Sequence, residues 1–152
     1  MCEVEIDPET GSAEVIAYVA VDDVGTEINP MLLAGQIHGG VAQGIGNAFY
    51  EQQFFDSEAQ LLNGTLADYL LPTAPDIPRM MLDHTVTLST TNELGIKGVG
   101  EAGAIPVGPL FAQALEDALD LPARGIHIVD IPMSPQRLYE VVRTGKVAAS
   151  QG

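Results

Sequence analysis

The sequence predicts an α+β fold for a single domain, because two kinds of hydrophobic periodicity occur along it without strict alternation. A two-residue alternation is present at the N-terminus, where Val4 and Ile6 lie between acidic residues. A four-residue repeat typical of a helix begins at Leu33. The chain has 152 residues, of which 46% are hydrophobic, and this length is sufficient for one domain with a core. We expect residues 1–145 to form this domain and residues 146–152 to form a flexible tail.

The first elements are predicted to be a β-hairpin and a helix. The turn sequence DPETG separates Val4 and Ile6 from a β-branched run, Val15–Val21. After a polar break, Asn29 is a candidate N-cap and Pro30 lies near the start of the helix.

The predicted helix contains an unusual number of glycines. Its apolar residues recur at intervals of four: Leu33, Ile37, Val41, Ile45 and Phe49. The same segment carries five glycines: Gly35, Gly39, Gly40, Gly44 and Gly46. Each interior glycine costs about 0.5–1 kcal/mol of helix stability relative to alanine, so five are too many for an unconstrained surface helix. We therefore expect another backbone or a bulky ligand to lie close against this helix.

The middle of the chain is predicted to contain a second hairpin and a further strand. The hairpin is expected where Phe54–Phe55 and Leu61–Leu62 flank a polar turn. Three prolines within residues 72–78 then predict an extended, non-helical stretch, and residues 79–90 predict a strand.

The C-terminal part is predicted to contain a helix, a short strand and a last helix. The first of these helices begins after Pro106 or Pro109. Its inward residues are predicted to be Leu110, Ala114, Leu115 and Ala118. The sequence GIHIVDIP, residues 125–132, predicts the short strand, and the last helix has Ser134 as its N-cap and Gly145 as its stop.

Composition and charge exclude several classes of partner. The chain has 6 Lys and Arg residues against 21 Asp and Glu residues, which gives a net charge of −15. Nucleic acids and anionic membranes require a positive surface, so neither is an expected partner. No apolar run approaches the roughly 20 residues that are needed to cross a bilayer. The single cysteine, Cys2, permits no internal disulfide, which is compatible with a reducing cytoplasm.

The segment GIKGVGEAG places four glycines and one glutamate within nine positions. Gly98, Gly100 and Gly103 match the G-x-G-x-x-G pattern of dinucleotide-binding loops. The context does not fit such a loop, because the preceding predicted strand ends well before it and Glu101 would lie beside an anionic pyrophosphate. One alternative is a tight turn with Glu101 in solvent. The other is a ligand site shared with the glycine-rich helix, in which the Glu101 carboxylate acts as general base towards a hydroxyl or water.

Several segments together resemble a known family. The segments GQIHGGVAQGIG, DYLLPTAPDIP and GIKGVGEAG, in this order and at these distances, are similar to the C-terminal part of the molybdenum subunit of the xanthine oxidase family. The segment VDDVGTEINPMLLAGQ is similar to that family too. The family includes carbon monoxide dehydrogenases, aldehyde oxidoreductases and xanthine dehydrogenases. The resemblance covers nearly the whole chain, which makes it far more specific than one glycine pattern.

The resemblance implies an oxidoreductase with a molybdenum–molybdopterin cofactor, which in bacteria is often the cytosine dinucleotide form. It implies that Glu101 deprotonates the hydroxyl that attacks the substrate, with water as the oxygen source, and that electrons leave through iron–sulfur centres and FAD on partner chains or domains. The cofactor-binding residues that it implies are Gln43, Gly44, Gly40, Lys97, Gly98, Val99 and Gly100. The pterin itself ligates the metal, so no protein metal ligand is expected.

The family's molybdenum subunits are several hundred residues long, whereas this chain resembles only their C-terminal portion. We therefore expect a fragment or subunit that works in the cytoplasm with the missing N-terminal portion, an iron–sulfur subunit and an FAD subunit. Its substrate would be a small molecule: an aldehyde, a heterocycle or carbon monoxide. An alternative is a non-catalytic assembly or interaction domain that completes a molybdopterin site with a partner chain.

Overall fold

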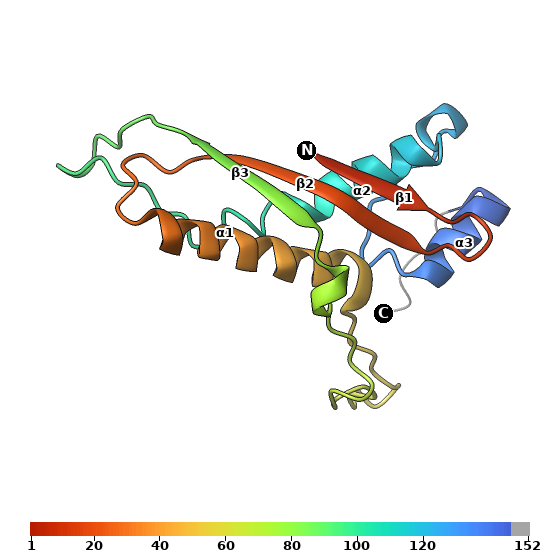
Figure 1. Ribbon diagram of the computed structural model, residues 1–152. Helices are drawn as coiled ribbons and strands as arrows, with labels where there is room; N and C mark the ends of the chain where they lie inside the picture. Colours follow the sequence, from red (N-terminus) through yellow and green to blue (C-terminus); the bar gives the residue numbers. More distant parts are fainter. Residues whose placement is uncertain (147–152) are drawn as a thin grey trace.

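A computed structural model describes residues 1–146, so the predicted tail lies outside the described residues apart from Lys146. The sheet has three strands in the spatial order β1-β2-β3: β1 Cys2–Ile6, β2 Ala13–Asp23 and β3 Arg79–Thr85. Strand β1 pairs antiparallel with β2, whereas β2 pairs in parallel with β3. The sheet lies over a layer of helices (Figure 1). This arrangement confirms the predicted α+β class.

The predicted N-terminal hairpin is confirmed, and Asp7 closes its turn. The Asp7 carboxylate accepts hydrogen bonds from the Thr10 hydroxyl at 2.8 Å and from the Glu9 amide at 2.9 Å. These two bonds, the Thr10 one foremost, hold the pKa of Asp7 below its usual value. Gly11 follows with a φ of +74°, a left-handed conformation that favours glycine.

The glycine-rich segment forms α1, Pro30–Ile45, and continues as a π-helical turn, Gly46–Tyr50. The Asn29 side chain caps α1 as predicted, because it accepts a hydrogen bond from the Leu32 amide at 3.1 Å. The buried residues of the predicted apolar face are Ile37, Val41, Ile45 and Phe49. Helix α1 connects β2 to β3 and supplies the crossover that a parallel pair of strands requires.

Residues 51–78 form an arm that projects from the end of α1 (Figure 1). The predicted second hairpin is reduced here to a single antiparallel bridge between Phe55 and Leu61. The proline stretch is also not wholly non-helical, because it contains a 3-10 turn, Ala74–Asp76. That turn is stabilised by Thr73, whose amide and hydroxyl both donate hydrogen bonds of 2.6 Å to the Asp76 carboxylate.

The Asn63 side chain links the two segments of the arm by hydrogen bonds to the backbone. Asn63 is buried, and its Oδ1 accepts a hydrogen bond from the Phe54 amide at 3.0 Å, while its Nδ2 donates to the Gln52 carbonyl at 2.6 Å. These side-chain bonds close the arm at its base without regular pairing of two strands.

Helix α2, Val107–Ala118, starts directly after Pro106. Its buried residues are Val107, Phe111 and Leu115. The predicted inward face is therefore wrong in part: Leu115 is buried and Leu110 and Ala114 are half-buried, but Ala118 is exposed. The inward face is set by the four-residue spacing from the first residue of the helix, Val107.

The last helix, α3 Pro135–Thr144, has both predicted caps. The Ser134 hydroxyl accepts a hydrogen bond from the Arg137 amide at 3.5 Å, and Gly145 ends the helix with a φ of +66°. The strand predicted for residues 125–132 is wrong, because no described strand lies beside this segment to form a ladder.

One hydrophobic core joins the sheet to the helices. The rings of Tyr18 in β2, Phe49 in the π-helical turn and Phe111 in α2 meet there, with centroid distances of 6.1 Å for Tyr18–Phe111 and 5.1 Å for Phe49–Phe111. Burial of each ring stabilises the fold by about 1.5–3 kcal/mol. None of the described helices covers the outer face of the sheet, which exposes Ile16, Val21 and Met81.

Part of the glycine content of α1 is explained by close approach within the chain. A Cβ added to Gly40 would lie 3.0 Å from the Gly103 Cα, and one added to Gly44 would lie 2.5 Å from the Val107 Cβ. A Cβ added to Gly103 would lie 2.4 Å from the carbonyl oxygen of Ile37. The glycine segment and the start of α2 are therefore the backbones that were expected to lie against this helix.

The two exposed glycines of α1, Gly35 and Gly39, have no such close neighbour. A Cβ added to Gly35 or Gly39 would meet no atom within 4 Å beyond the adjacent turns of the same helix. Their φ angles are not left-handed. Neither backbone strain nor internal packing therefore requires glycine at these two positions.

The end of β2 is clamped to the glycine segment by a charged pair. Lys97 Nζ lies 2.8 Å from the Asp23 carboxylate, and the Thr87 hydroxyl and amide also donate hydrogen bonds to that carboxylate. The Lys97 hydrogen bond, followed by those of Thr87, holds the pKa of Asp23 well below its usual range. The backbone reinforces the clamp, because the Lys97 amide donates to the Val24 carbonyl at 3.1 Å.

Alanine at two glycines of α1 tests the packing. Gly44→Ala is expected to lower the free energy of unfolding by about 1–3 kcal/mol, because its Cβ has no room beside Val107. The matched control Gly39→Ala is expected to raise it by about 0.5–1 kcal/mol, because it removes a flexible helix residue without a clash. Denaturant unfolding measures both. Equal effects of the two substitutions would contradict the packing account.

The clamp predicts a specific acid sensitivity. Because the folded-state pKa of Asp23 is depressed, its stabilisation is fully present above the unfolded-state pKa of about 3.9 and is lost as the pH falls towards the folded-state value. The variant Asp23→Asn lacks this titration, so its unfolding midpoint is expected to fall less between about pH 5 and pH 2 than that of the parent chain. Parallel pH profiles for the two proteins would contradict a stabilising role for the Asp23 carboxylate.

Candidate active site

The glycine segment Gly95–Gly103 runs from the end of β2 to the side of α1. It begins with an isolated bridge between Gly25 and Ile96. It reaches α1 at Gly100, whose carbonyl oxygen accepts a hydrogen bond of 2.6 Å from Nε2 of Gln36. Sequence reasoning missed Gln36, since its only local signal is its place in the glycine-rich helix, and the contact joins residues 64 positions apart.

Glu101 lies directly after this contact and is exposed. Its carbonyl oxygen accepts hydrogen bonds from the Ala104 amide at 2.9 Å and the Ile105 amide at 3.1 Å, so its backbone starts a tight turn before α2. Among residues 1–146, no side chain or amide forms a hydrogen bond or ion pair with its carboxylate. The backbone of Glu101 is therefore fixed while its carboxylate is left available to a ligand.

Gly98 and Gly100 are exposed, and the space that a side chain would occupy at each of them is open. A Cβ added to either would meet no atom within 4 Å beyond its chain neighbours, and neither has a left-handed φ. Together with Gly35 and Gly39, they form two stretches of open backbone that the chain's own packing does not need. Open backbone of this kind permits a large, flat ligand to come close.

A cavity beside this segment has a volume of about 350 Å³. It lies between residues 24–29, the first two turns of α1 and residues 96–99, and Gln36, Lys97 and Val99 are among its lining residues. The remaining lining is mostly apolar: Val24, Ile28, Leu32, Leu33 and Ile96. A mostly apolar hollow with a few polar groups at one edge is the usual form of a cofactor or ligand site.

The predicted site residues fall into two sets in the structure. Lys97, Val99 and their glycine neighbours lie along the glycine segment, next to Glu101. The second set is on α1: Gln43 is exposed there, one helical turn after the open Gly39. Gly40 and Gly44, predicted as cofactor-binding residues, face Gly103 and Val107 of this chain instead of open space.

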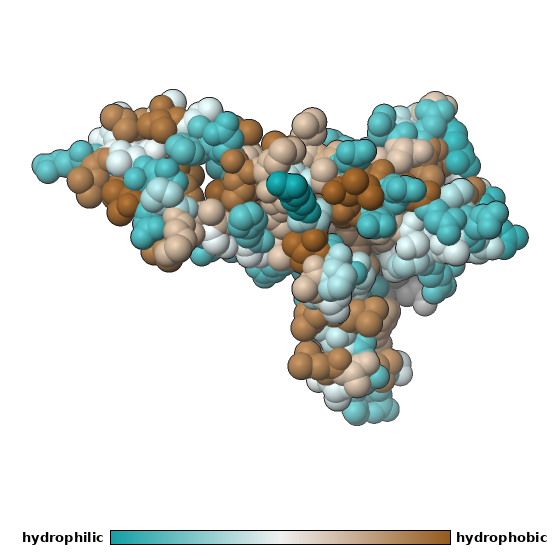
Figure 2. Space-filling view, in the orientation of Figure 1, coloured by the Kyte–Doolittle hydropathy of each residue, from teal (hydrophilic) through white to brown (hydrophobic). Residues whose placement is uncertain are grey.

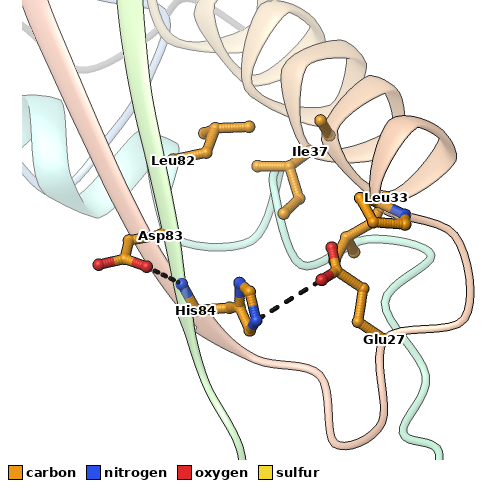
Figure 3. A pocket seen from close by; sticks show the side chains of 8 residues that line it. Glu27, Leu33, Ile37, Leu82, Asp83 and His84 are labelled. Atoms are coloured by element: carbon orange, nitrogen blue, oxygen red, sulfur yellow. Dashed lines mark hydrogen bonds and ion pairs between the residues drawn. The ribbon is translucent and has the colours of Figure 1, made fainter.

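A smaller cavity of about 140 Å³ lies between α1 and the end of β3 (Figure 3). His84 projects into it, with Nε2 3.6 Å from a carboxylate oxygen of Glu27, and the His84 amide donates to the Asp83 carboxylate at 2.9 Å. Within the part of the chain that the structure describes, no three His, Cys, Asp or Glu side chains lie close enough together to hold a metal ion. None of the helices in residues 1–146 has the length and hydrophobicity to span a membrane.

Comparison with known proteins identifies the family. Residues 1–78, about half of the chain, match the model of the molybdopterin cofactor-binding domain. The chain is 40% identical over 148 residues to the carbon monoxide dehydrogenase large chain of Hydrogenophaga pseudoflava, which covers 97% of this chain and 18% of that protein. It is 37% identical over 121 residues to the xanthine dehydrogenase molybdenum-binding subunit of Escherichia coli O157:H7, covering 79% of this chain and 15% of that subunit.

A solved structure agrees with these matches. Quinoline 2-oxidoreductase from Pseudomonas putida 86 superimposes with a TM-score of 0.86 and 39% identity, over 93% of this chain and 18% of that one. The chain thus spans less than a fifth of the length of each of these three relatives. By its sequence match and its fold, the chain belongs to the family of molybdopterin cofactor-binding domains.

Proposed function

We propose that this chain forms one wall of the cofactor site of a molybdenum hydroxylase, in which Glu101 is the general base. The observation that carries the proposal is the free, exposed Glu101 carboxylate immediately after the open backbone of Gly98 and Gly100. The names of the relatives support it, because they include a carbon monoxide dehydrogenase large chain and a xanthine dehydrogenase molybdenum-binding subunit.

The residues present fit a bound molybdenum–molybdopterin, for which we propose the cytosine dinucleotide form. When bound, this group supplies a redox-active metal that accepts two electrons from the substrate. The backbone amides of Gly98, Val99 and Gly100 would face the bound cofactor, and the Gln43 side chain would offer it an amide donor from α1. The Lys97 ammonium group is held by Asp23 and its amide by the Val24 carbonyl, so we assign Lys97 to positioning the glycine segment beside the cofactor.

The chemical step of this chain is a proton transfer at Glu101. Its carboxylate oxygens accept a proton from a hydroxyl or water held at the site, which increases the nucleophilicity of that oxygen. Two contacts hold the turn that carries Glu101: the Gln36 bond to the Gly100 carbonyl, and the packing of Gly103 on α1. Gly40 and Gly44 act indirectly in this scheme, since they permit the turn and α2 to approach α1.

The complete activity requires more polypeptide than this chain contains. We propose that its partners are the remaining polypeptide of a molybdenum-binding subunit, an iron–sulfur subunit and an FAD subunit, working together in the cytoplasm. The substrate is a small molecule of the classes that the relatives' names print or the family implies: carbon monoxide, an aldehyde or a heterocycle.

A second candidate function is a non-catalytic assembly domain that completes a molybdopterin site with a partner chain. The arm favours it, because it exposes large apolar side chains around acidic ones (Figure 2). The exposed members are Phe54, Phe55, Leu61, Leu62, Leu66, Leu70 and Leu71. Exposed apolar surface of this extent is typical of protein–protein contacts, and it is compatible with either function.

Replacement of the proposed base separates the two functions. In the assembled enzyme, Glu101→Gln is expected to lower kcat by at least about 100-fold, because the amide accepts no proton at this step. Molybdenum and pterin contents are expected to stay within error of the parent enzyme. Loss of molybdenum together with activity would make Glu101 a binding residue, and unchanged turnover would favour the assembly function.

A methyl group added at an exposed glycine tests whether the glycine segment contacts the cofactor. Gly98→Ala is expected to leave the unfolding midpoint of the cofactor-free chain unchanged, because the added methyl group meets no atom of the chain. In the assembled enzyme it is expected to reduce the pterin content severalfold. The control Gly64→Ala, which adds the same group in the arm where only Leu61 is near, is expected to change neither quantity. Full pterin occupancy in Gly98→Ala would contradict the proposed contact between the glycine segment and the cofactor.

A further inference from the structure

We propose that residues 126–131, which are not a strand among residues 1–146, become an edge strand by pairing with an added β-strand from the further polypeptide that the longer relatives contain. We call this segment the open strand. The proposal rests on the proposed partnership of the chain with such polypeptide, and it assigns that partnership a defined attachment site. It does not depend on the role of Glu101.

The open strand has the side-chain alternation of a β-strand although no described strand pairs with it. Ile128 is buried and Ile126 and Asp130 are half-buried, whereas His127, Val129 and Ile131 are exposed. Val129 is 88% exposed, which is a large exposure for a valine. A two-residue period with apolar side chains on the outward side is typical of a strand that is covered on both faces.

Among residues 1–146, the backbone of the same outward residues has no hydrogen-bond partner. No described residue accepts a hydrogen bond from the amides of His127, Val129 or Ile131, and none donates to their carbonyl oxygens. In a β-strand, every second residue directs both its N–H and its C=O towards the same neighbour. His127 and Val129 therefore offer donors and acceptors towards one neighbour, and Ile131 follows where the chain bends.

The other side of the open strand is already fixed. The Ile128 amide donates a hydrogen bond to the Glu116 carboxylate of α2, and the Met133 amide, beyond its end, donates to the Ala48 carbonyl at 2.7 Å. The segment is thus held against the helices along one side.

An apolar hollow lies beside the open strand. Its volume is about 290 Å³, and Ile128–Ile131 line it together with Gly108, Pro109 and Ala112 from the start of α2. Strand addition commonly combines main-chain pairing with pockets for alternate side chains of the incoming strand. We assign this hollow to an apolar side chain of the added strand.

The outer edge of β3 does not offer an equivalent site. Its residues include Arg79, Asp83 and His84, and charged side chains on an edge strand oppose pairing with another strand. The outward residues of the open strand include Val129 and Ile131, which favour pairing. The side chains on the two edges therefore favour the open strand over β3 as the site of pairing.

Charge and length identify the source of the added strand. A second copy of this chain also carries a net charge of −15, so pairing of two copies brings together two strongly acidic proteins. The relatives extend far beyond the matched region, which is only 17–18% of the carbon monoxide dehydrogenase large chains. We therefore assign the added strand to this further polypeptide and not to a second copy.

Amide hydrogen exchange tests the proposal in cofactor-free protein. In the 152-residue chain alone, the amides of His127, Val129 and Ile131 are expected to exchange rapidly, and light scattering is expected to show a monomer. In the chain assembled with the remaining polypeptide of its subunit, the same amides are expected to exchange at least about 100-fold more slowly. Because no cofactor is present, this result is independent of whether Glu101 is the base.

Two variants at one position separate main-chain pairing from side-chain contact. Val129→Pro removes the central donor and is expected to weaken assembly with the remaining polypeptide by about tenfold or more. Val129→Thr keeps the amide and the branched shape, and is expected to assemble within about threefold of the parent chain. Circular dichroism of the isolated variants checks that both fold, and a misfolded Val129→Pro leaves the exchange measurement as the test.

Three results would overturn the proposal. Equal exchange rates of the three amides in the isolated and the assembled protein would exclude an added strand. Equal weakening by Val129→Pro and Val129→Thr would assign the contact to the side chain alone. Protection of these amides in a dimer of the isolated chain would make the occupant a second copy.

Discussion

The backbones of α1 and the glycine segment are in close contact at glycine residues. This contact determines the position of the rest of the candidate site. Gly103 lies so close to the Ile37 carbonyl that a methyl group has no room there, and Gly40 and Gly44 permit the matching approach from the helix side. The core depends on the same contact, because Val107 and Phe111 of α2 reach the ring cluster only if α2 begins close to α1. A single packing constraint therefore links the stability of the fold to the place of Glu101.

The glycine segment is held by contacts at Lys97 and at the Gly100 carbonyl, and the side-chain positions of its glycines Gly98 and Gly100 are open. At the first end the Asp23–Lys97 pair ties it to β2, and at the other end Gln36 ties the Gly100 carbonyl to α1. Between these anchors, Gly98 and Gly100 have no neighbour that requires glycine. Glycine is thus present in this short segment for two separate physical reasons. Gly103 is needed for packing within the chain, whereas Gly98 and Gly100 leave room for something outside it.

Local interactions of the fold were predictable from the sequence. The N-terminal hairpin, the Asn29 cap of α1 and the caps of α3 depend on residues a few positions apart, so turn and capping chemistry is sufficient to locate them. The inward face of α2 was missed in part because it depends on which of two prolines precedes the helix. The open strand has a strand sequence, but a strand also needs a partner, and none of the described residues supplies one.

The candidate site was predictable only in its parts. The glycine segment and the glycine-rich helix both indicated close approach, yet their sequences do not say which glycines meet each other and which remain open. That distinction, and the Gln36 contact across 64 positions, required the tertiary structure. The roles of Glu101 and the cofactor-facing residues stay predictions, supported by the membership of the chain in the molybdopterin cofactor-binding domain family.

The most direct measurement is a crystal structure of the cofactor-loaded enzyme that contains this chain. The account predicts that the amides of Gly98–Gly100 face the pterin, and that a Glu101 carboxylate oxygen lies within about 2.6–3.2 Å of an oxygen held at the metal, or one water molecule away from it. A Glu101 side chain directed into solvent, with the cofactor bound elsewhere on the chain, would contradict the account.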